Sequence, residues 1–229
     1  DLFAIQDEIA RSIAVALKLK LFLDPMPGQP TSDPVAHDLW MKGRSISQRF
    51  TPAAMAQARD CYEEVIARDP RFARPYFGLA ELLFYGVQFG LATSPDDTSR
   101  ARDAITTSLA LDDSFGESHA LSGVLRGVLD YDWPGAEAAF HRAFELSPGS
   151  ASVLIQHAWF YLVPKMRVPE ALEEAEQAVA LDPLAPFTRG RFGNVLQVAR
   201  QYARAAEECR EAVRLAPELW WLHWFYGFA

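Results

Sequence analysis

Cysteine and long apolar segments are both scarce in this chain of 229 residues. The only cysteines are Cys61 and Cys209, which lie far apart without a CxxC or a Cys/His cluster. That usage suits a reducing compartment and offers no disulfide framework, so we predict a cytoplasmic protein. No apolar run approaches the roughly 20 residues that a membrane-spanning helix needs. The chain opens with Asp1 and Leu2 rather than with a basic leader, so we expect no signal peptide.

Lysine and asparagine are scarce as well. Of the 22 basic residues 18 are arginine, Asn194 is the single asparagine, and the formal net charge is −8. No basic cluster falls on a predicted helix face, which argues against binding to nucleic acid or to an anionic membrane. We interpret the arginine bias as typical of a GC-rich bacterial genome.

Motifs of catalysis and metal binding are also missing. The sequence contains no GxGxxG after a strand, no P-loop, no GxSxG and no HExxH, and its five histidines show no i, i+4 pairing. Its adjacent carboxylates fall on predicted solvated helix faces. The composition, 50% hydrophobic with a mean hydropathy of −0.06, is that of a globular chain. We therefore predict a non-enzymatic protein with no metal and no cofactor.

A period of about 34 residues runs through the sequence instead. Similar segments, from IARDPRF to VRLAPEL, repeat at spacings of 43, 35, 35 and 34 residues. Each has a helix-ending residue at the same position, and we call these five the marker residues: Pro70, Asp113, Pro148, Pro183 and Pro217. Proline cannot continue a helix, so each marker is expected to follow the end of one.

Small residues recur at fixed distances from every marker. An alanine stands twelve residues before each marker, and alanine or glycine stands ten residues after it. Small residues on two antiparallel helices let the backbones approach closely, while bulky neighbours fill the flanking grooves. We expect these neighbours eight residues before the marker, as in Tyr62 and Phe140, and two residues before it, as in Leu111 and Leu181.

This unit resembles the tetratricopeptide repeat (TPR), in which two antiparallel helices, A and B, end in a closing proline. The resemblance predicts an all-α, right-handed TPR-type helical-hairpin solenoid over residues 35–229. Its repeats would span residues 35–70, 73–113, 116–148, 151–183 and 186–217, with a partial repeat at 220–229. Two departures are expected to form loops or a longer helix: about nine extra residues around 86–95, and an irregular turn around 49–52.

Two further segments precede the repeats. Residues 1–23 have the pattern of an amphipathic junction helix, and residues 24–34, with four prolines, are typical of a linker. This junction resembles those of bacterial multidomain regulators, in which a class III nucleotide cyclase or a winged-helix module precedes TPRs. The resemblance implies a regulatory part of a larger signalling protein.

The TPR resemblance also implies a concave groove lined by helix A. Its register assigns the following twelve residues to that groove: Arg74, Phe77, Glu81, Val124, Ile155, Trp159, Arg191, Asn194, Gln197, Trp221, Trp224 and Phe228. Arg191 and Asn194 resemble only a fragment of the carboxylate clamp of chaperone-binding TPRs. The mixed apolar and aromatic groove suits an amphipathic helix or an apolar peptide.

The aromatic segment WWLHWFYGFA at residues 220–229 would be helix A of the partial repeat. Its apolar face, on which Trp221, Trp224, Phe225 and Phe228 would lie together, needs a cover, which we expect to be a partner, a second copy or further chain. The predicted function is protein-protein interaction within a bacterial signalling protein. Two alternatives stay open: a region that dimerises or gates an attached nucleotide cyclase, and a sensor that holds a small apolar ligand in the groove.

Overall fold

The structure is a computed structural model, which describes residues 31–92 and 94–229. The predicted junction helix at 1–23 and most of the predicted linker at 24–34 lie outside the described residues. Within the described ranges every regular element is a helix, so the all-α prediction is confirmed. No helix there is long and apolar enough to cross a membrane.

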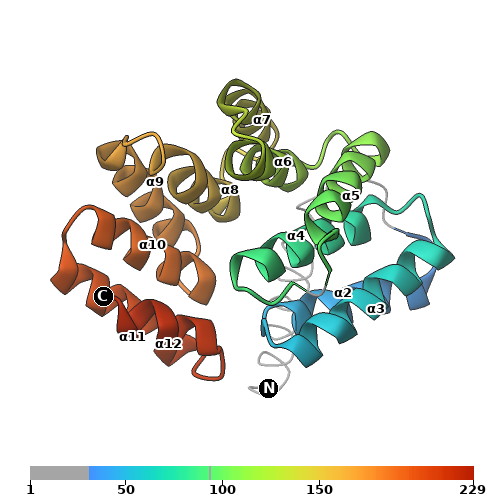
Figure 1. Ribbon diagram of the computed structural model, residues 1–229, viewed down its shortest axis with the longest axis horizontal. Coiled ribbons are helices and arrows are strands. Elements are labelled where there is room, and N and C mark those ends of the chain that lie inside the picture. Colours follow the sequence, from blue (N-terminus) through green and yellow to red (C-terminus); the bar gives the residue numbers. More distant parts are fainter. Residues whose placement is uncertain (1–30, 93) are drawn as a thin grey trace, which may run out of the picture.

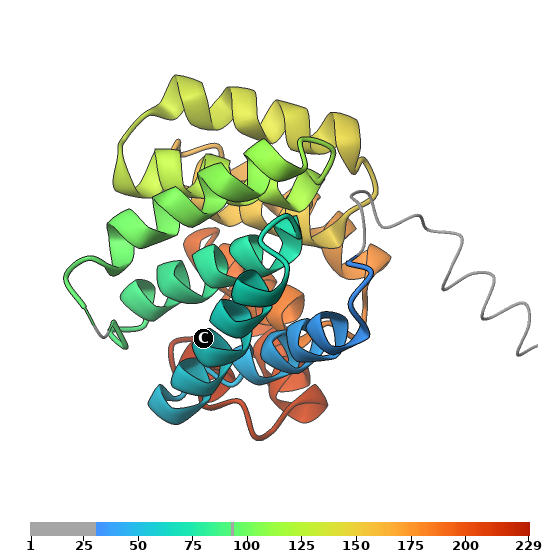
Figure 2. The ribbon, with the colours of Figure 1, turned by 90° about the vertical axis from the view of Figure 1, so that its right-hand side faces the viewer.

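The helices form consecutive pairs. In chain order they are listed here: α2 (Pro34–Ser47) with α3 (Pro52–Arg68), α4 (Ala73–Gln88) with α5 (Asp97–Leu111), α6 (Gly116–Leu129) with α7 (Trp133–Leu146), α8 (Ala151–His157) continued by the π-helical segment η1 (Ala158–Leu162) with α9 (Val168–Leu181), α10 (Pro186–Val198) with α11 (Tyr202–Leu215), and α12 (Trp220–Gly227). The pairs follow one another along an arc that brings α12 near α2 and α3 (Figure 1). Figure 2 shows the first and last helices at the same lower end of the molecule.

The small-residue stripes form the contact within each pair. The alanines twelve residues before the markers, such as Ala58 and Ala136, are completely buried. Gly123 of α6 lies so close to Phe140 of α7 that an added Cβ would be 2.9 Å from two atoms of the Phe140 ring. Tyr62, Ile105 and Phe140, eight residues before their markers, are buried as expected. Small residues thus set the distance between paired helices.

The bulky contacts expected two residues before the markers are wrong at two of the four leucines, while Leu146 and Leu215 are half-buried. Leu111 and Leu181 stand at this position and are exposed. At 100° per residue this position lies about 80° away from the stripe that starts twelve residues before the marker. The buried face continues instead five residues before the marker, at Val65, Ser108, Ala143, Ala178 and Ala212.

The turns within each pair share one backbone feature. Each contains a residue with a left-handed φ: Phe50 (45°), Gly90 (67°), Tyr131 (55°), Met166 (59°) and Arg200 (60°). Four of the five are not glycine, although the conformation costs other residues about 1–2 kcal/mol. The first two fall in the predicted irregular regions. In the second of these, α4 extends to Gln88, and residues 89–92 and 94–96 lie outside helices.

The turns at the markers share a side-chain hydrogen bond that the sequence analysis did not anticipate. The residue six positions after the marker donates to the marker carbonyl in four turns: Tyr76 to Pro70 (3.2 Å), His119 to Asp113 (3.0 Å), Arg189 to Pro183 (2.8 Å) and His223 to Pro217 (2.8 Å). The fifth turn has Leu154 there. Each bond ties the start of helix A to the end of the preceding helix B.

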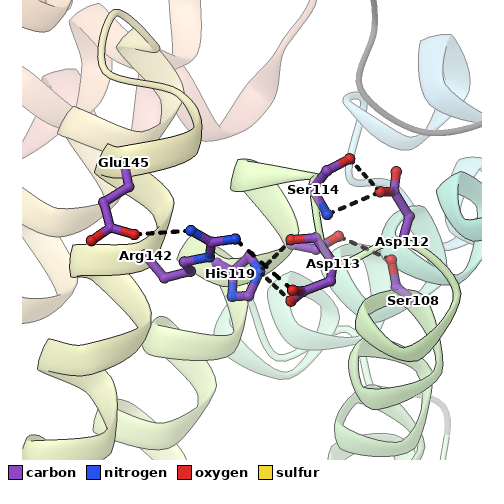
Figure 3. A network of polar contacts seen from close by, with 8 residues as sticks. Ser108, Asp112, Asp113, Ser114, His119, Arg142 and Glu145 are labelled. Atoms are coloured by element: carbon purple, nitrogen blue, oxygen red, sulfur yellow. Dashed lines mark hydrogen bonds and ion pairs between the residues drawn. The ribbon is translucent and has the colours of Figure 1, made fainter.

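A polar network extends one of these turns to a third helix (Figure 3). His119 also approaches the Asp113 carboxylate (3.1 Å), and Arg142 of α7 lies 3.9 Å from the same carboxylate and 2.9 Å from Glu145. Asp112 accepts hydrogen bonds from the backbone and hydroxyl of Ser114. Because most of these groups are exposed, the network adds little stability and mainly fixes the turn.

Candidate functional site

The A helices enclose a cavity on the concave side of the array. Its volume is about 460 Å³, within the range of about 300–1,000 Å³ that is usual for ligand sites. Side chains of α2, α4, α6, α8, α10 and α12 all contribute to its wall. Ser152 and Asp182 lie on the wall and are exposed, so the cavity opens to solvent at this end.

One register position supplies a wall residue from every repeat after the first. The residue four positions after each marker lines the cavity: Arg74, Glu117, Ser152, Phe187 and Trp221. These residues lie in the first turns of the A helices. The first repeat contributes Trp40, Arg44, Ser47 and Gln48 of α2.

Aromatic rings dominate one end of the cavity. Arg74 is nine-tenths buried. Its guanidinium carbon lies 4.0 Å from the centroid of the Phe115 ring and 6.0 Å from that of the Trp40 ring. Arg44 lies 5.9 Å from Trp40. Burial lowers the pKa of Arg74. Both guanidinium groups therefore lie against aromatic faces, an attraction that is strengthened where water is excluded.

Glu81 is the carboxyl group most affected by the cavity. It forms no hydrogen bond or ion pair with any residue that the structure describes. Burial raises its pKa to about 7, and the neighbouring Glu117 adds to the rise while Arg44 opposes it. At neutral pH the side chain is thus near the middle of its titration, and a donor or cation in the cavity would favour its ionised form.

A second cluster lies where the two arms of the arc meet. The Arg191 guanidinium of α10 is surrounded by five rings, with centroids between 5.0 and 6.0 Å away, from residues listed here: Tyr85, Trp159, Phe160, Phe187 and Phe225. It has no hydrogen bond or ion pair with the described residues, and its Nε is buried without a partner. Burial lowers the pKa of Arg191 to about 10.

The aromatic end segment closes the arc. The indole of Trp220 donates to the Phe50 carbonyl (2.8 Å) and that of Trp221 donates to the Gln48 carbonyl (3.1 Å). Phe89 of the loop after α4 packs against Trp220, Trp221, Trp224 and Phe225, with centroids 5.7–6.5 Å apart. The first two repeats of the same chain therefore supply part of the cover, which the sequence analysis expected from a partner, a second copy or further chain.

That cover is incomplete. Trp221 and Phe225 are 1% and 2% exposed, whereas Trp224 and Phe228 are 51% and 65% exposed. The four residues were expected to share one face of the helix, and the structure divides them between a buried and an open side. A Cβ added to Gly227 would meet nothing within 4 Å, so this small-residue position has no helix against it among the described residues.

The predicted groove residues fall into four groups. Arg74, Phe77, Glu81 and Trp221 line the cavity. Arg191 and Trp159 belong to the second cluster, and Asn194 is buried on the same helix as Arg191, while Gln197 donates to the Phe225 carbonyl (3.4 Å). Trp224 and Phe228 lie on the open side of α12.

Val124 and Ile155 form the fourth group and lie in the core instead. Each is 1% exposed, belongs to the hydrophobic core and is absent from the cavity wall. These two side chains cannot contact a ligand in the cavity without a rearrangement of the core.

Several wall residues were missed by the sequence analysis: Trp40, Arg44, Glu117, Ser152, Gln156, Phe187 and Thr188. The recurrence four residues after the marker would have found Glu117, Ser152 and Phe187. Gln156 had no comparable signal, since the equivalent positions are occupied by Gly78, Leu121, Arg191 and Phe225.

No metal site is formed by the described residues, since no group of three or more His, Cys, Asp or Glu side chains converges there. Both cysteines are buried and free. His157 pairs with Glu174 (2.7 Å) and stacks on Tyr161, which is a structural contact between α8 and α9.

Comparison with known proteins places this fold. No protein-family model matches the chain. Of curated proteins, the transcriptional regulator HilA of Salmonella typhimurium is 23% identical over 79% of this chain and 31% of its own length. Putative adenylate cyclase 3 of Rhizobium meliloti is 32% identical over 52% of this chain and 21% of its own length. The chain thus spans about a third or less of these relatives.

Solved structures extend the comparison. A thermophilic TPR protein of Thermus thermophilus superposes with a TM-score of 0.65 at 15% identity, over 84% of this chain and 97% of that one. The human IFIT1 dimer with m7Gppp-AAAA gives a TM-score of 0.68 at 16% identity, over 83% of this chain and 45% of that one. These likenesses concern the fold, and they confirm the predicted helical-hairpin solenoid.

Proposed function

Because the chain has the tetratricopeptide-repeat fold, we propose that it is a non-catalytic protein-interaction module in which a segment of a partner protein occupies the central cavity. The proposed setting is the cytoplasm of a bacterium, in a larger signalling protein. The bacterial regulator and cyclase with which the chain aligns support that setting. The net charge of −8 favours a protein partner over nucleic acid or an anionic membrane.

One observation carries this proposal: every repeat contributes a side chain to a single cavity that opens to solvent. A cavity of about 460 Å³ is too small for a whole helix, whose diameter with side chains is about 10–12 Å. It accommodates a few side chains of an extended segment. Of the predicted groove residues, Arg74, Phe77, Glu81 and Trp221 are the proposed contacts, and Arg191, Trp159, Asn194 and Gln197 support them from the adjoining cluster.

A second candidate function is an intramolecular one. The alignment with a putative adenylate cyclase favours a role in which the repeats dimerise or gate an attached catalytic domain. In that case the segment in the cavity would come from the same polypeptide, or a second copy would pack on the open side of α12, where Trp224 and Phe228 are exposed.

Site-specific photo-crosslinking in the source cells tests these alternatives. Benzoylphenylalanine replaces Ser152, on the cavity wall, or Tyr202, an exposed residue of α11 on the outer side of the array. We expect Ser152 to give a defined crosslinked peptide that Tyr202 does not give. Mass spectrometry then identifies the peptide as part of another protein or of the same polypeptide.

Crosslinks that are the same at both positions, or absent at Ser152, would contradict occupation of the cavity. A crosslinked peptide from an attached catalytic domain of the same polypeptide would favour the intramolecular function. A crosslink between the two copies through α12, probed with the photo-reactive residue at Trp224, would indicate dimerisation.

A further inference from the structure

The chemistry of the cavity wall points to the kind of side chain that it receives. Two acceptors on the wall have no donor among the described residues: the carboxyl group of the half-buried Glu81, and Oε1 of Gln156, a residue that is 3% exposed. Gln156 uses its amide nitrogen to donate to Ser152 (3.0 Å), which leaves the oxygen unpaired. A buried acceptor without a donor is unfavourable, as at Gln156, and the half-buried Glu81 carboxyl group can still accept hydrogen bonds. Both groups are therefore suited to a ligand that brings N–H donors.

The charges of the wall agree with this assignment. Three carboxyl side chains, Glu81, Glu117 and Asp182, line the cavity with two guanidinium groups, Arg44 and Arg74. Both guanidinium groups lie against the Trp40 and Phe115 rings, at one end of the cavity. The wall formed by α8, α10 and α12 has no cationic side chain. Phe187 and Trp221 are the rings of that wall, and Tyr85 of α4 is a further ring of the cavity; the faces of such rings attract cations.

We infer, on the premise that the cavity holds a partner segment as proposed above, that this segment inserts an arginine or lysine side chain that hydrogen-bonds Glu81 and Gln156. The aliphatic stem of such a side chain packs against the aromatic wall, and its charged head reaches the two acceptors. The partner segment therefore contains a basic residue flanked by apolar residues.

The pH dependence of binding follows from Glu81 and the charged groups that share its cavity. Arg44 of α2 and Glu117 of α6 act on Glu81 directly. The other titratable or charged groups of the described wall are Tyr62 of α3, Arg74 and Tyr85 of α4, and Asp182 before α10. Burial raises the pKa of both tyrosines further above neutrality. No histidine or cysteine is on the described wall. Since burial brings the pKa of Glu81 to about 7, its ionised fraction increases about tenfold between pH 6 and pH 8.

Binding of fluorescein-labelled capped heptapeptide libraries tests the inference. The central residue is fixed as Arg, Lys, Gln or Glu, the other six positions are random apolar residues, and affinity is measured by fluorescence anisotropy. We expect the Arg and Lys libraries to bind at least tenfold more tightly than the Gln and Glu libraries at pH 8. That preference should weaken by about tenfold at pH 6.

Two variants separate the role of Glu81 from general charge. Glu81→Gln should remove most of the preference for basic libraries and its pH dependence. Glu207→Gln, which neutralises an exposed carboxylate on α11 away from the cavity, should leave both unchanged. Circular dichroism checks that both variants are folded.

Equal binding of the Gln or Glu library, or an undiminished basic preference in Glu81→Gln, would overturn the inference and leave the interaction module intact. Binding of no library would also overturn it, and the crosslinks at Ser152 would then decide whether the cavity holds any partner. The inference and the proposed function therefore fail through different results.

Discussion

The two helices of each repeat pack through small residues, whereas α12 packs on the first two repeats through large aromatic ones. Within the pairs, alanine and glycine at fixed distances from the markers bring helix backbones together, as Gly123 does with Phe140. At the closure, the Trp220 and Trp221 indoles donate to backbone carbonyls about 170 residues earlier in the chain, and Phe89 packs against four rings. The first contact is repeated and local, and the second occurs once and joins distant segments.

The two departures from the repeat period supply the receiving side of the closure. Phe50 lies in the irregular turn of the first repeat, and Phe89 lies among the extra residues of the second. Their rings are 5.2 Å apart, and Trp221 lies 6.0 Å from Phe50. An irregularity in a repeat sequence can therefore mark a place where the array makes a contact outside its period.

The largest expected effect breaks the closure. Trp221→Ala removes a fully buried ring that packs on Phe50, Phe187 and Phe225, and we expect a loss of roughly 3–5 kcal/mol in the free energy of unfolding. Urea denaturation followed by circular dichroism measures it. Trp224→Ala, on the open side of the same helix, should cost less than about 1 kcal/mol. Equal losses would mean that the closure does not form in solution.

A smaller effect breaks a repeat contact. Gly123→Val places a branched side chain against the Phe140 ring and the Ala136 carbonyl, 2.9 and 3.2 Å from its Cβ, and overpacking of this kind costs about 1–3 kcal/mol. The matched control is Gly227→Ala, at the same register position, where the added methyl meets nothing within 4 Å. Alanine favours helix more than glycine does, so the control should be neutral or gain up to about 1 kcal/mol. Destabilisation by both substitutions to the same extent would contradict the packing account.

The smallest expected effect sharpens the comparison, because Glu81 of the second repeat and Trp221 of the closure line the same cavity. Its pKa is about 7 in the folded chain and 4.5 ordinarily, so the folded state holds the proton more tightly. The stabilisation by this group is therefore complete below about pH 4.5 and is lost as the pH rises through 7. Glu81→Gln should stabilise the chain by about 1–2 kcal/mol at pH 8, allowing for partial solvent exposure, and should change little near pH 4.5.

Urea denaturation at both pH values measures that difference, and a Trp221→Ala background tests its link to the closure. If the closure buries Glu81, opening it lets water reach the carboxyl group, and the gain at pH 8 should shrink. A gain from Glu81→Gln that is the same at both pH values would show that ionisation is not its cause.

The sequence predicted most of the fold because the relevant contacts are periodic. The alanines before the markers and the residues eight positions before them are buried as expected, since five similar units impose the same packing. Two of the leucines two positions before the markers were misplaced, because proximity to a helix end does not decide which face a residue occupies. Helical angle does, and it points Leu111 and Leu181 to solvent.

The candidate site was predicted only in part. Register correctly suggested that helix A lines the concave side, and Arg74, Phe77, Glu81 and Trp221 lie on the cavity wall. Register could not tell how far each helix is rotated and curved, and so it assigned to the groove Val124 and Ile155, which lie in the core. The π-helical segment η1 places the Trp159 and Phe160 rings 5.5 and 5.2 Å from the Arg191 guanidinium. The repeat period contains no pattern that predicts this segment.

The sequence by itself determined the repeating unit, the positions of its helices and the small residues that join them, because these depend on contacts between residues close in the chain. Only the tertiary structure decided that the arc closes, that Trp221 is buried while Trp224 is not, and that Glu81 and Gln156 share one cavity. Those outcomes depend on the summed rotation of six consecutive A helices, in which small differences at each repeat accumulate over the array.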